Sequence, residues 1–402
     1  MKDLDANLLI NALIVFAVAG VISFASSPLV RMFAIKFKLM DVPEDDRRMH
    51  TVPTPRLGGL AVFLGFLFSV LLLVPITYEL RGILIGAVVI VIMAAIDDAV
   101  KLHYIPRFIT QIFAACIPVF FGVRIEAFSN FHFSSAEPYF DLGFLSIPAT
   151  IIWIVLLTNA VNWIDGLDGL STGVSTISAF SIFLVSLLLP EPLPLIALVM
   201  AAVCGACVGF LPYNKFPAKM FIGDSGAMFL GYILATMSIL GLFKFYAVVS
   251  FAVPFLILGL PIFESVTSIL RRVLRGKNPM KGDRGHIHHR LIDMGLSQKQ
   301  AVAILYVASA ILGLAAVVLA TSGELRAILL IVSGVVAAVV ALWVYSSRHK
   351  TQEDIELQES EQESKQQATQ EPAQEQQEVG GENNADNDGT ENENDGENDR
   401  DG

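Results

Sequence analysis

The sequence predicts an all-α, polytopic membrane protein. Hydrophobic residues make up 54% of the 402 residues, and only 16% are charged. Mean hydropathy is +0.62. Apolar runs of close to 20 residues recur along the chain, which is about the length that a helix needs to cross a bilayer. Because most of these runs are apolar on all sides, they suit packing in lipid and not the core of a soluble domain.

We expect eleven transmembrane spans in a membrane domain that covers residues 1–350. Their approximate ranges are 8–30, 57–76, 80–96, 107–122, 145–162, 172–189, 193–211, 226–243, 246–270, 299–320 and 325–346. The first run lacks a basic leading segment and a clear cleavage site. We therefore expect it to be a retained span and not a signal peptide.

Charge is distributed unevenly between the membrane domain and the end of the chain. The formal net charge is −11, but residues 351–402 hold 18 acidic and 2 basic residues. The remaining 350 residues carry 20 acids and 25 bases, so the membrane domain is mildly basic. A basic body suits anionic lipids and substrates. The acidic tail has almost no apolar residues and is predicted to be disordered.

Basic residues also predict the orientation in the membrane. Loops that follow odd-numbered spans hold 18 Lys and Arg residues, against 4 in the even-numbered loops. The odd loops and the tail are therefore predicted to be cytoplasmic. All five polar clusters of the chain fall in the odd loops or at their edges. These clusters are Arg47-Arg48-x-His50 with Arg56, Asp97-Asp98 with Lys101, Asn159 to Asp168, Asn214 with Asp224, and His286-x-His288-His289.

An aspartate pair, Asp97 and Asp98, closes the third span. Adjacent carboxylates at a membrane surface repel each other, and such a pair can hold a divalent cation or supply a base. Lys101 follows one turn later and can neutralise a phosphate. The alternative is a helix end with solvated charges, which the apolar residues directly before the pair make less suitable.

Asn159, Asn162, Asp165 and Asp168 repeat every three residues at the end of the fifth span. On a helix this spacing keeps the side chains on a shared, slowly rotating face. Oxygen ligands at this density suit Mg²⁺, a metal-bound pyrophosphate or sugar hydroxyls. A capped helix end with solvated amides is the alternative.

Asp224 opens the eighth span, with Gly223 directly before it and Gly226 two residues after it. An aspartate there is a good helix N-cap, and it can also ligate a metal beside N–H groups that face a phosphate. Asn214, ten residues earlier, can return to the same place through Pro217.

Two further clusters combine histidine and basic residues. His286, His288 and His289 lie in a loop rich in bases, which suits a nucleoside diphosphate. No cysteine or second histidine pair accompanies them, which argues against zinc. Arg56 either binds a lipid phosphate or simply follows the positive-inside rule. Glu264 stands alone near the inner end of its span, where it either pairs structurally or joins the site.

Together, these motifs resemble the polyprenyl-phosphate N-acetylhexosamine-1-phosphate transferase family, over roughly residues 8–346. Members move a sugar 1-phosphate from a UDP-sugar to a membrane polyprenyl phosphate and release UMP. The pieces are short, and their order and spacing carry the resemblance. The His-Ile-His-His form is similar to the branch that uses UDP-N-acetylglucosamine. The proline before a His-His-His run, usual in the muramoyl-pentapeptide branch, is absent.

The resemblance implies roles for the matching positions. Asp97 and Asp98 are the catalytic pair, with Asp97 as the favoured base on the lipid phosphate. Asp224, with Asp165, binds Mg²⁺, for which Mn²⁺ can substitute. The stretch after Lys101 is poor in lysines, and Arg107 is the candidate to replace them. The predicted substrate-binding residues are Lys101, Asn159, Asn162, Asp168, Asn214, His286, His288, His289 and Arg56.

We therefore expect an enzyme of the bacterial inner membrane with its active site on the cytoplasmic face. It would transfer N-acetylglucosamine 1-phosphate to undecaprenyl phosphate, at the start of a cell-envelope glycan. Direct attack by the lipid phosphate is expected, with an aspartyl intermediate as the alternative. Another donor, such as UDP-N-acetylmuramoyl-pentapeptide, is the second choice. A secondary transporter is disfavoured because the midplane of nearly every span is apolar.

The predicted partners are the UDP-sugar, the polyprenyl phosphate and the membrane, with a homodimer as a further candidate and no nucleic acid. The sequence contains no Walker motif, Gly-rich dinucleotide fingerprint or nucleophile elbow.

Overall fold

A computed structural model of the protein describes residues 6–42, 53–129, 139–189, 191–242, 249–274, 276 and 286–321. All of them belong to one compact unit, residues 1–340. The predicted span 325–346 and the predicted acidic tail lie outside the described residues, as do Arg47, Arg48 and His50.

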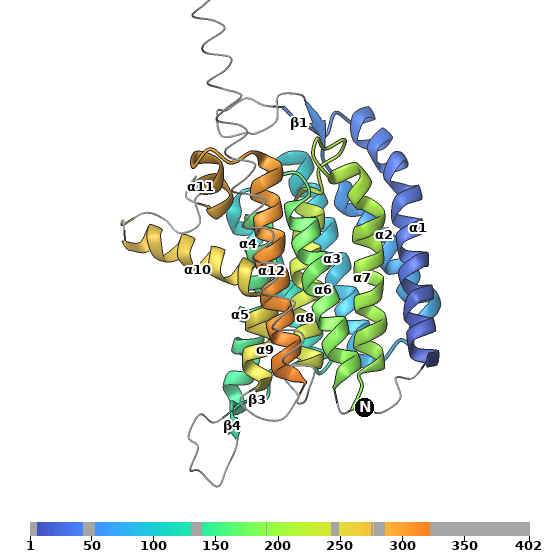
Figure 1. Ribbon diagram of the computed structural model, residues 1–402, viewed down its shortest axis with the longest axis vertical. Helices are drawn as coiled ribbons and strands as arrows, with labels where there is room; N and C mark the ends of the chain where they lie inside the picture. The colour runs from blue at the N-terminus through green and yellow to red at the C-terminus, as the bar shows by residue number, and fades with distance from the viewer. Residues whose placement is uncertain are drawn as a thin grey trace, which may run out of the picture. The chain divides into compact units, whose positions relative to one another are not determined.

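The described residues form a bundle of α-helices, which confirms the predicted fold class (Figure 1). The longer helices are α1 (Ala6–Lys36), α2 (Gly58–Leu73), α3 (Tyr78–Val100), α4 (Tyr104–Phe120), α5 (Ser146–Ile164), α6 (Leu170–Leu188), α7 (Pro194–Asn214), α8 (Gly223–Gly241), α10 (Gly259–Leu274) and α12 (Gln298–Ala320). The shorter helices are α9 (Val249–Ile257), α11 (Ile287–Asp293) and the 3₁₀ turn η1 (Gly143–Leu145). Two antiparallel strand pairs join β1 (Met40–Asp41) to β2 (Thr54–Pro55) and β3 (Ala127–Ser129) to β4 (Tyr139–Asp141).

Seven helices of the described part are long and apolar enough to cross a membrane, namely α1, α3, α5, α6, α7, α8 and α12. The apolar helices α2 and α4 are shorter. These nine helices match nine of the predicted spans. Membrane helices are set mainly by the length of an apolar run, so their existence is readable from sequence even where their ends shift by several residues.

The predicted single span at 246–270 is wrong. The chain breaks there into α9 and α10, and Figure 1 shows α10 lying across the direction of the long helices. Pro261 has no N–H to donate to the carbonyl of Ile257, four residues earlier, which favours a break at this point. Ser178 Oγ of α6 donates instead to the Ile257 carbonyl at 3.0 Å. The break is therefore stabilised by a hydrogen bond from a neighbouring helix.

α8 lies at the centre of the bundle, with nearly every residue buried. Small residues allow this close packing. A side chain at Gly231, for example, would collide with the backbone of Leu157 on α5. Glycines also allow α1 and α7 to pack closely. A side chain at Gly205 would collide with the carbonyl of Phe16, and a side chain at Gly209 would collide with the carbonyl of Gly20. Helices in lipid associate through such close backbone contacts.

We expect Gly205→Val to push α1 away from α7. Overpacking of this kind costs about 1–3 kcal/mol, so the variant should unfold at a lower temperature in detergent micelles. Val208→Ala is the matched control, because Val208 is 44% exposed on the same helix. Equal unfolding temperatures for Gly205→Val and the wild type would contradict the proposed packing.

Candidate active site

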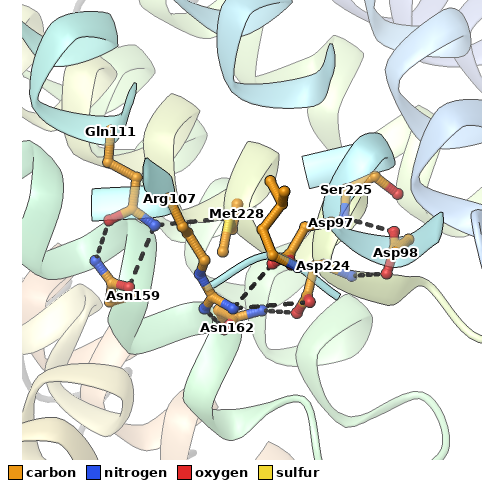
Figure 2. Close-up of polar contacts among 10 residues, drawn as sticks. Asp97, Asp98, Arg107, Gln111, Asn159, Asn162, Asp224, Ser225 and Met228 are labelled. Atoms are coloured by element: carbon orange, nitrogen blue, oxygen red, sulfur yellow. Dashed lines mark hydrogen bonds and ion pairs between the residues drawn. The ribbon is translucent and has the colours of Figure 1, made fainter. Parts of the chain in front are cut away.

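Polar residues from four helices meet at one end of the bundle, where α3 and α5 end and α4 and α8 begin (Figure 2). Arg107 of α4 contacts Asp97 of α3 and Asn162 of α5, and Asn162 contacts Asp224 of α8. The predicted convergence of distant clusters is thereby confirmed for these residues.

The Asp98 carboxylate caps the N-terminus of α8. Its Oδ1 accepts the Asp224 N–H at 2.9 Å, and its Oδ2 accepts the Ser225 N–H at 3.0 Å. The first N–H groups of a helix lack partners within that helix, and an anion there is favoured by the helix dipole. Gly223 has a φ of +71°, and a Cβ at this position would lie 2.7 Å from Asp98 Oδ2. Glycine at this position therefore allows both the positive φ of the turn and the close approach of the Asp98 carboxylate.

The loop before α8 is also held by backbone pairing with the start of α2. Gly58 N–H donates to the Phe221 carbonyl at 2.9 Å, and Gly59 N–H donates to the Ile222 carbonyl at 2.7 Å. A side chain at either glycine would collide with this region. The glycines of the Arg56-Leu57-Gly58-Gly59 sequence thus allow the close approach that positions Asp224.

Asp97 is buried but faces the polar groups of the site. Its Oδ1 accepts the Leu102 N–H at 2.7 Å, and its Oδ2 accepts a hydrogen bond from Arg107 Nη1 at 3.1 Å. Lys101 ends α3 with a positive φ of 52° and is exposed. Asp97 keeps acceptor capacity on both oxygens, since each carboxylate oxygen has two lone pairs.

Arg107 connects the acids and the amide of the site. Its Nη2 donates to Asn162 Oδ1 at 2.6 Å, and its Nη1 lies 3.8 Å from Asp224 Oδ2. Asn162 Nδ2 in turn donates to Asp224 Oδ1. Arg107 is therefore a component of the site and fits the replacement for the missing lysines.

Asn159 lies one turn further into the bundle and contacts none of these acids. Its Nδ2 donates to Gln111 Oε1 at 2.7 Å, and Gln111 Nε2 donates back to Asn159 Oδ1 at 3.3 Å (Figure 2). Gln111 is almost completely buried. The structure thus gives Asn159 a pairing role between α4 and α5.

Asp165 and Asp168 lie in the turn between α5 and α6. Asp165 Oδ1 accepts from Ser171 Oγ at 2.6 Å, and Asp168 Oδ2 accepts the Ala218 N–H at 2.9 Å. Burial raises the pKa of Asp165 to about 7, while the Ser171 hydrogen bond lowers it and the Asp224 carboxylate raises it. An adjacent cation would favour the ionised form. Asp168 instead holds the loop that follows α7.

Asn214 is buried where α7 ends. Its Oδ1 accepts from Thr172 Oγ1 at 2.7 Å, and its Nδ2 donates to the Met220 carbonyl at 3.1 Å. It therefore fastens the 215–222 loop to α6, and through this loop it helps to place Asp224.

The histidine motif begins α11 and is anchored by Glu264 of α10. Glu264 Oε1 lies 2.7 Å from His286 Nδ1 and accepts the Ile287 N–H at 2.9 Å. Glu264 is 3% exposed. Because Oε1 already accepts one N–H, the short contact with His286 is favourable when Nδ1 carries a proton. Glu264 is therefore paired structurally, and its partner is a predicted site residue.

His288 packs against Gly166, where any side chain would collide with the imidazole ring. Burial, with weaker effects of His289 and His286, lowers the pKa of His288 to about 3. His288 is therefore neutral at pH 7. The close contact brings the histidine motif to the Asn159–Asp168 string.

Arg56 lies beside the acids at the start of α2. Its Nη1 is 4.0 Å from Asp41 Oδ1. Burial lowers the pKa of the guanidinium, but the carboxylates of Asp41, Asp224 and Asp98 outweigh this effect and raise it. Arg56 thus adds positive charge close to the site.

The oxygen donors of the site fit Mg²⁺ chemistry. Within the described ranges, no three histidine, cysteine or carboxylate side chains are grouped so as to hold a metal ion by themselves. Mg²⁺ is commonly bound by one or two carboxylates together with substrate phosphates. Asp224 can serve in this way, and Asp165 lies near enough for the Asp224 carboxylate to raise its pKa.

Comparison with known proteins gives the family. A model of glycosyl transferase family 4 matches residues 80–242. The probable undecaprenyl-phosphate N-acetylglucosaminyl 1-phosphate transferase of Bacillus subtilis (strain 168) is 36% identical over 312 residues, covering 77% of this chain and 86% of that protein. The chain belongs to glycosyl transferase family 4. The resemblance drawn from the sequence motifs is confirmed.

Two further relatives of this family 4 chain represent different branches. The decaprenyl-phosphate N-acetylglucosaminephosphotransferase of Mycolicibacterium smegmatis is 32% identical over 364 residues, with 81% of this chain and 86% of that protein covered. A phospho-N-acetylmuramoyl-pentapeptide-transferase of Listeria monocytogenes is 32% identical over 243 residues, with 56% and 74% covered. The match to the N-acetylglucosaminephosphotransferase covers more of both chains than the match to the pentapeptide-transferase.

Sequence reasoning missed Gln111 and Ser171. A lone glutamine in an apolar helix and a serine in a small-residue run carry no signal of their own. Gln111 stands one helical turn after Arg107, and Asn159 stands one turn before Asn162. Only the packing of α4 against α5 reveals that Arg107 pairs with Asn162 and that Gln111 pairs with Asn159, one helical turn away.

We expect Asp98→Ala to destabilise the protein, because two α8 amides lose their shared acceptor. Loss of a helix cap costs about 1–2 kcal/mol, so the unfolding temperature in detergent should fall, and Asp98→Asn should lose less. Thr77→Ala is the matched control: Thr77 caps the other end of α3 by accepting the Leu80 N–H. It should lower the unfolding temperature while keeping transferase activity. An unchanged unfolding temperature for Asp98→Ala would contradict the assignment of Asp98 as the cap of α8.

We expect Glu264→Ala to reduce transferase activity about ten- to a hundredfold, as for other residues that orient a functional histidine. Glu264→Gln keeps an acceptor for the Ile287 amide and should lose less. Activity should be measured with the unfolding temperature, so that a folding defect is recognised. Full activity of a folded Glu264→Ala protein would remove the positioning role.

Proposed function

We propose that the protein transfers N-acetylglucosamine 1-phosphate from UDP-N-acetylglucosamine to undecaprenyl phosphate and releases UMP, as the first step of a cell-envelope glycan. The observation that carries this proposal is the Asp97–Arg107–Asn162–Asp224 network at one end of an apolar bundle. Relatives that cover most of the chain are named for this transfer to polyprenyl phosphates.

A site at the end of the bundle suits two very different substrates. The polyprenyl phosphate carries its chain in the lipid and its phosphate at the surface, while the UDP-sugar arrives from water. The excess of basic residues in the loops at this end supports a cytoplasmic location in a bacterial inner membrane. A homodimer remains a prediction.

We assign the catalytic base to Asp97 and a positioning role to Asp98. Both oxygens of Asp98 accept backbone N–H groups at the N-terminus of α8, so its carboxylate holds that helix end in place. Asp97 instead shares a guanidinium with Asp224 and faces the same polar space. A carboxylate in this position can accept or orient the proton of the lipid phosphate.

In the proposed reaction an oxygen of the polyprenyl phosphate attacks the β-phosphorus of the UDP-sugar. The bond from this phosphorus to the bridging oxygen breaks, and UMP leaves with that oxygen. Asn162 and Arg107 offer donors that can orient and stabilise the phosphoryl oxygens. In the alternative, an aspartate of the site would attack the phosphorus itself and form an aspartyl intermediate.

Asp224, with Asp165, is the proposed site for Mg²⁺, for which Mn²⁺ can substitute. When bound, the ion would neutralise charge that builds on the diphosphate. The remaining proposed contacts with substrate are those of Arg56, Lys101, Asn162 and the histidine motif, which lie around the same end of the bundle. His288, neutral at pH 7, can donate one hydrogen bond and accept another.

Transfer from UDP-N-acetylmuramoyl-pentapeptide is the second candidate, supported by the shorter Listeria match. A transporter is not favoured, because the acids gather at a bundle end and not at the middle of the spans.

The function is tested by following UMP release from UDP-N-acetylglucosamine with undecaprenyl phosphate and Mg²⁺ in detergent. We expect wild-type turnover, and a loss of at least about a hundredfold for Asp97→Asn and for Asp224→Asn. UDP-N-acetylmuramoyl-pentapeptide serves as the competing donor.

Asp141→Asn is the matched control, since Asp141 is exposed before α5, at the opposite end of that helix from Asn162. It should retain full activity. Full activity in both Asp97→Asn and Asp224→Asn, or release of UMP only with the muramoyl donor, would refute the proposal.

A further inference from the structure

Arg107 occupies the position in which a cation would neutralise the site. Its guanidinium lies 3.1 Å from Asp97 Oδ2 and 3.8 Å from Asp224 Oδ2, and donates to Asn162 Oδ1 at 2.6 Å. Its side chain is 23% exposed, against 5% for Asp97 and 26% for Asp224. One positive group therefore serves two carboxylates in a partly desolvated space, where attraction is stronger than in water.

The position of the guanidinium is built into the bundle. One helical turn below it, the amides of Gln111 and Asn159 pair reciprocally and fix α4 against α5. The Gln111 amide also donates to Met228 Sδ of α8 at 3.7 Å. The two hydrogen-bonded pairs, Gln111–Asn159 and Arg107–Asn162, join the same two helices, α4 and α5 (Figure 2). Arg107 is therefore directed at Asp224 by packing, and not placed there as a free surface arginine.

The Asp98 carboxylate is placed differently, because its two oxygens accept the first N–H groups of α8, which stabilise its charge. Arg107 is in ion-pair contact with both Asp97 and Asp224, while Arg56 adds a weaker attraction to Asp224 from outside ion-pair distance. A divalent cation at Asp224 would stand within a few ångströms of the guanidinium, and the two positive groups would repel each other.

We propose that Arg107 is the resident counter-ion of the substrate-free site and that it competes with the divalent cation for Asp224. When a cation binds Asp224, the guanidinium gives up its contact with Asp224 and keeps those with Asp97 and Asn162. Its remaining N–H groups can then bind the diphosphate of the nucleotide sugar. The second half of this inference, the binding of the diphosphate by Arg107, rests on the proposed function. The competition itself involves only the protein and the metal ion.

The structure supplies the reason for such an exchange. Without substrate, two carboxylates in an apolar bundle need a positive partner, because an unpaired buried charge is costly. With the diphosphate bound, the negative charge of the site increases and two positive groups can be accommodated. Metal binding and nucleotide binding should therefore favour each other through the movement of one side chain.

The test measures Mn²⁺ binding to purified full-length protein without substrates, from the loss of the free-ion electron paramagnetic resonance signal. Arg107→Met removes the competing charge and adds no metal ligand. We expect it to bind Mn²⁺ roughly tenfold more tightly than the wild type. Its KM for UDP-N-acetylglucosamine should rise, because the diphosphate loses its guanidinium partner.

Arg81→Met is the matched control, because it makes the same charge change at an exposed position near the other end of α3. It should leave Mn²⁺ affinity and turnover unchanged. Arg107→Lys retains the charge and should bind Mn²⁺ nearly as weakly as the wild type, which also provides a second variant if Arg107→Met does not fold.

Equal or weaker Mn²⁺ binding by Arg107→Met, or equal tightening by Arg81→Met, would overturn the proposal. Equal tightening by Arg107→Lys would also overturn it, since the charge would then not be the cause. If the wild type releases no UMP with any donor, the proposed function fails, while the Mn²⁺ comparison still decides the competition.

Discussion

The site depends on the contact between the Asp98 carboxylate and the first N–H groups of α8. This contact fixes the end of α3 against the start of the most buried helix of the bundle, and it holds Asp224 by its own backbone. The side chain of Asp224 is thereby free for other partners. Gly223 makes the contact possible, and the backbone pairing of Gly58 and Gly59 with the preceding loop stabilises it from the other side. A helix dipole and one carboxylate together organise the surroundings of the remaining acids.

Much of this arrangement was predictable from sequence, because the membrane restricts what the chain can do. Apolar runs of spanning length specify helices, and alternating directions return every second loop to the same end. The clusters around Asp97, Asn162 and Asp224 could meet once their loops were assigned to one side. The prediction was sound for the existence of the helices and the convergence of these clusters, since both follow from length and order alone.

The remaining features depend on contacts between distant residues, which periodicity does not reveal. The break at Leu258 follows from Pro261, but a proline within an apolar run can also be tolerated in a membrane helix. Ser178, from another helix, satisfies the carbonyl that the break exposes. Asn159 and Asn214 have the residue types of a binding site, yet Gln111 and Thr172 take up their hydrogen bonds. Residue type predicted polarity correctly, and packing decided the partners.

A charged site at the end of an apolar bundle must remain stable both with and without its anionic substrates. A fixed set of bases matched to the diphosphate would leave excess positive charge in the empty site, while a set matched to the acids alone would repel the substrate. In the proposed exchange, the guanidinium between Asp97 and Asp224 would serve both states, because arginine keeps its charge and has several N–H donors for different oxygen partners. Asn162 suits the same requirement, since its amide accepts from Arg107 and donates to Asp224 at once. The reciprocal hydrogen bonds of the Gln111–Asn159 pair, one turn further into the bundle, would hold α4 against α5 while the Arg107 side chain changes partners.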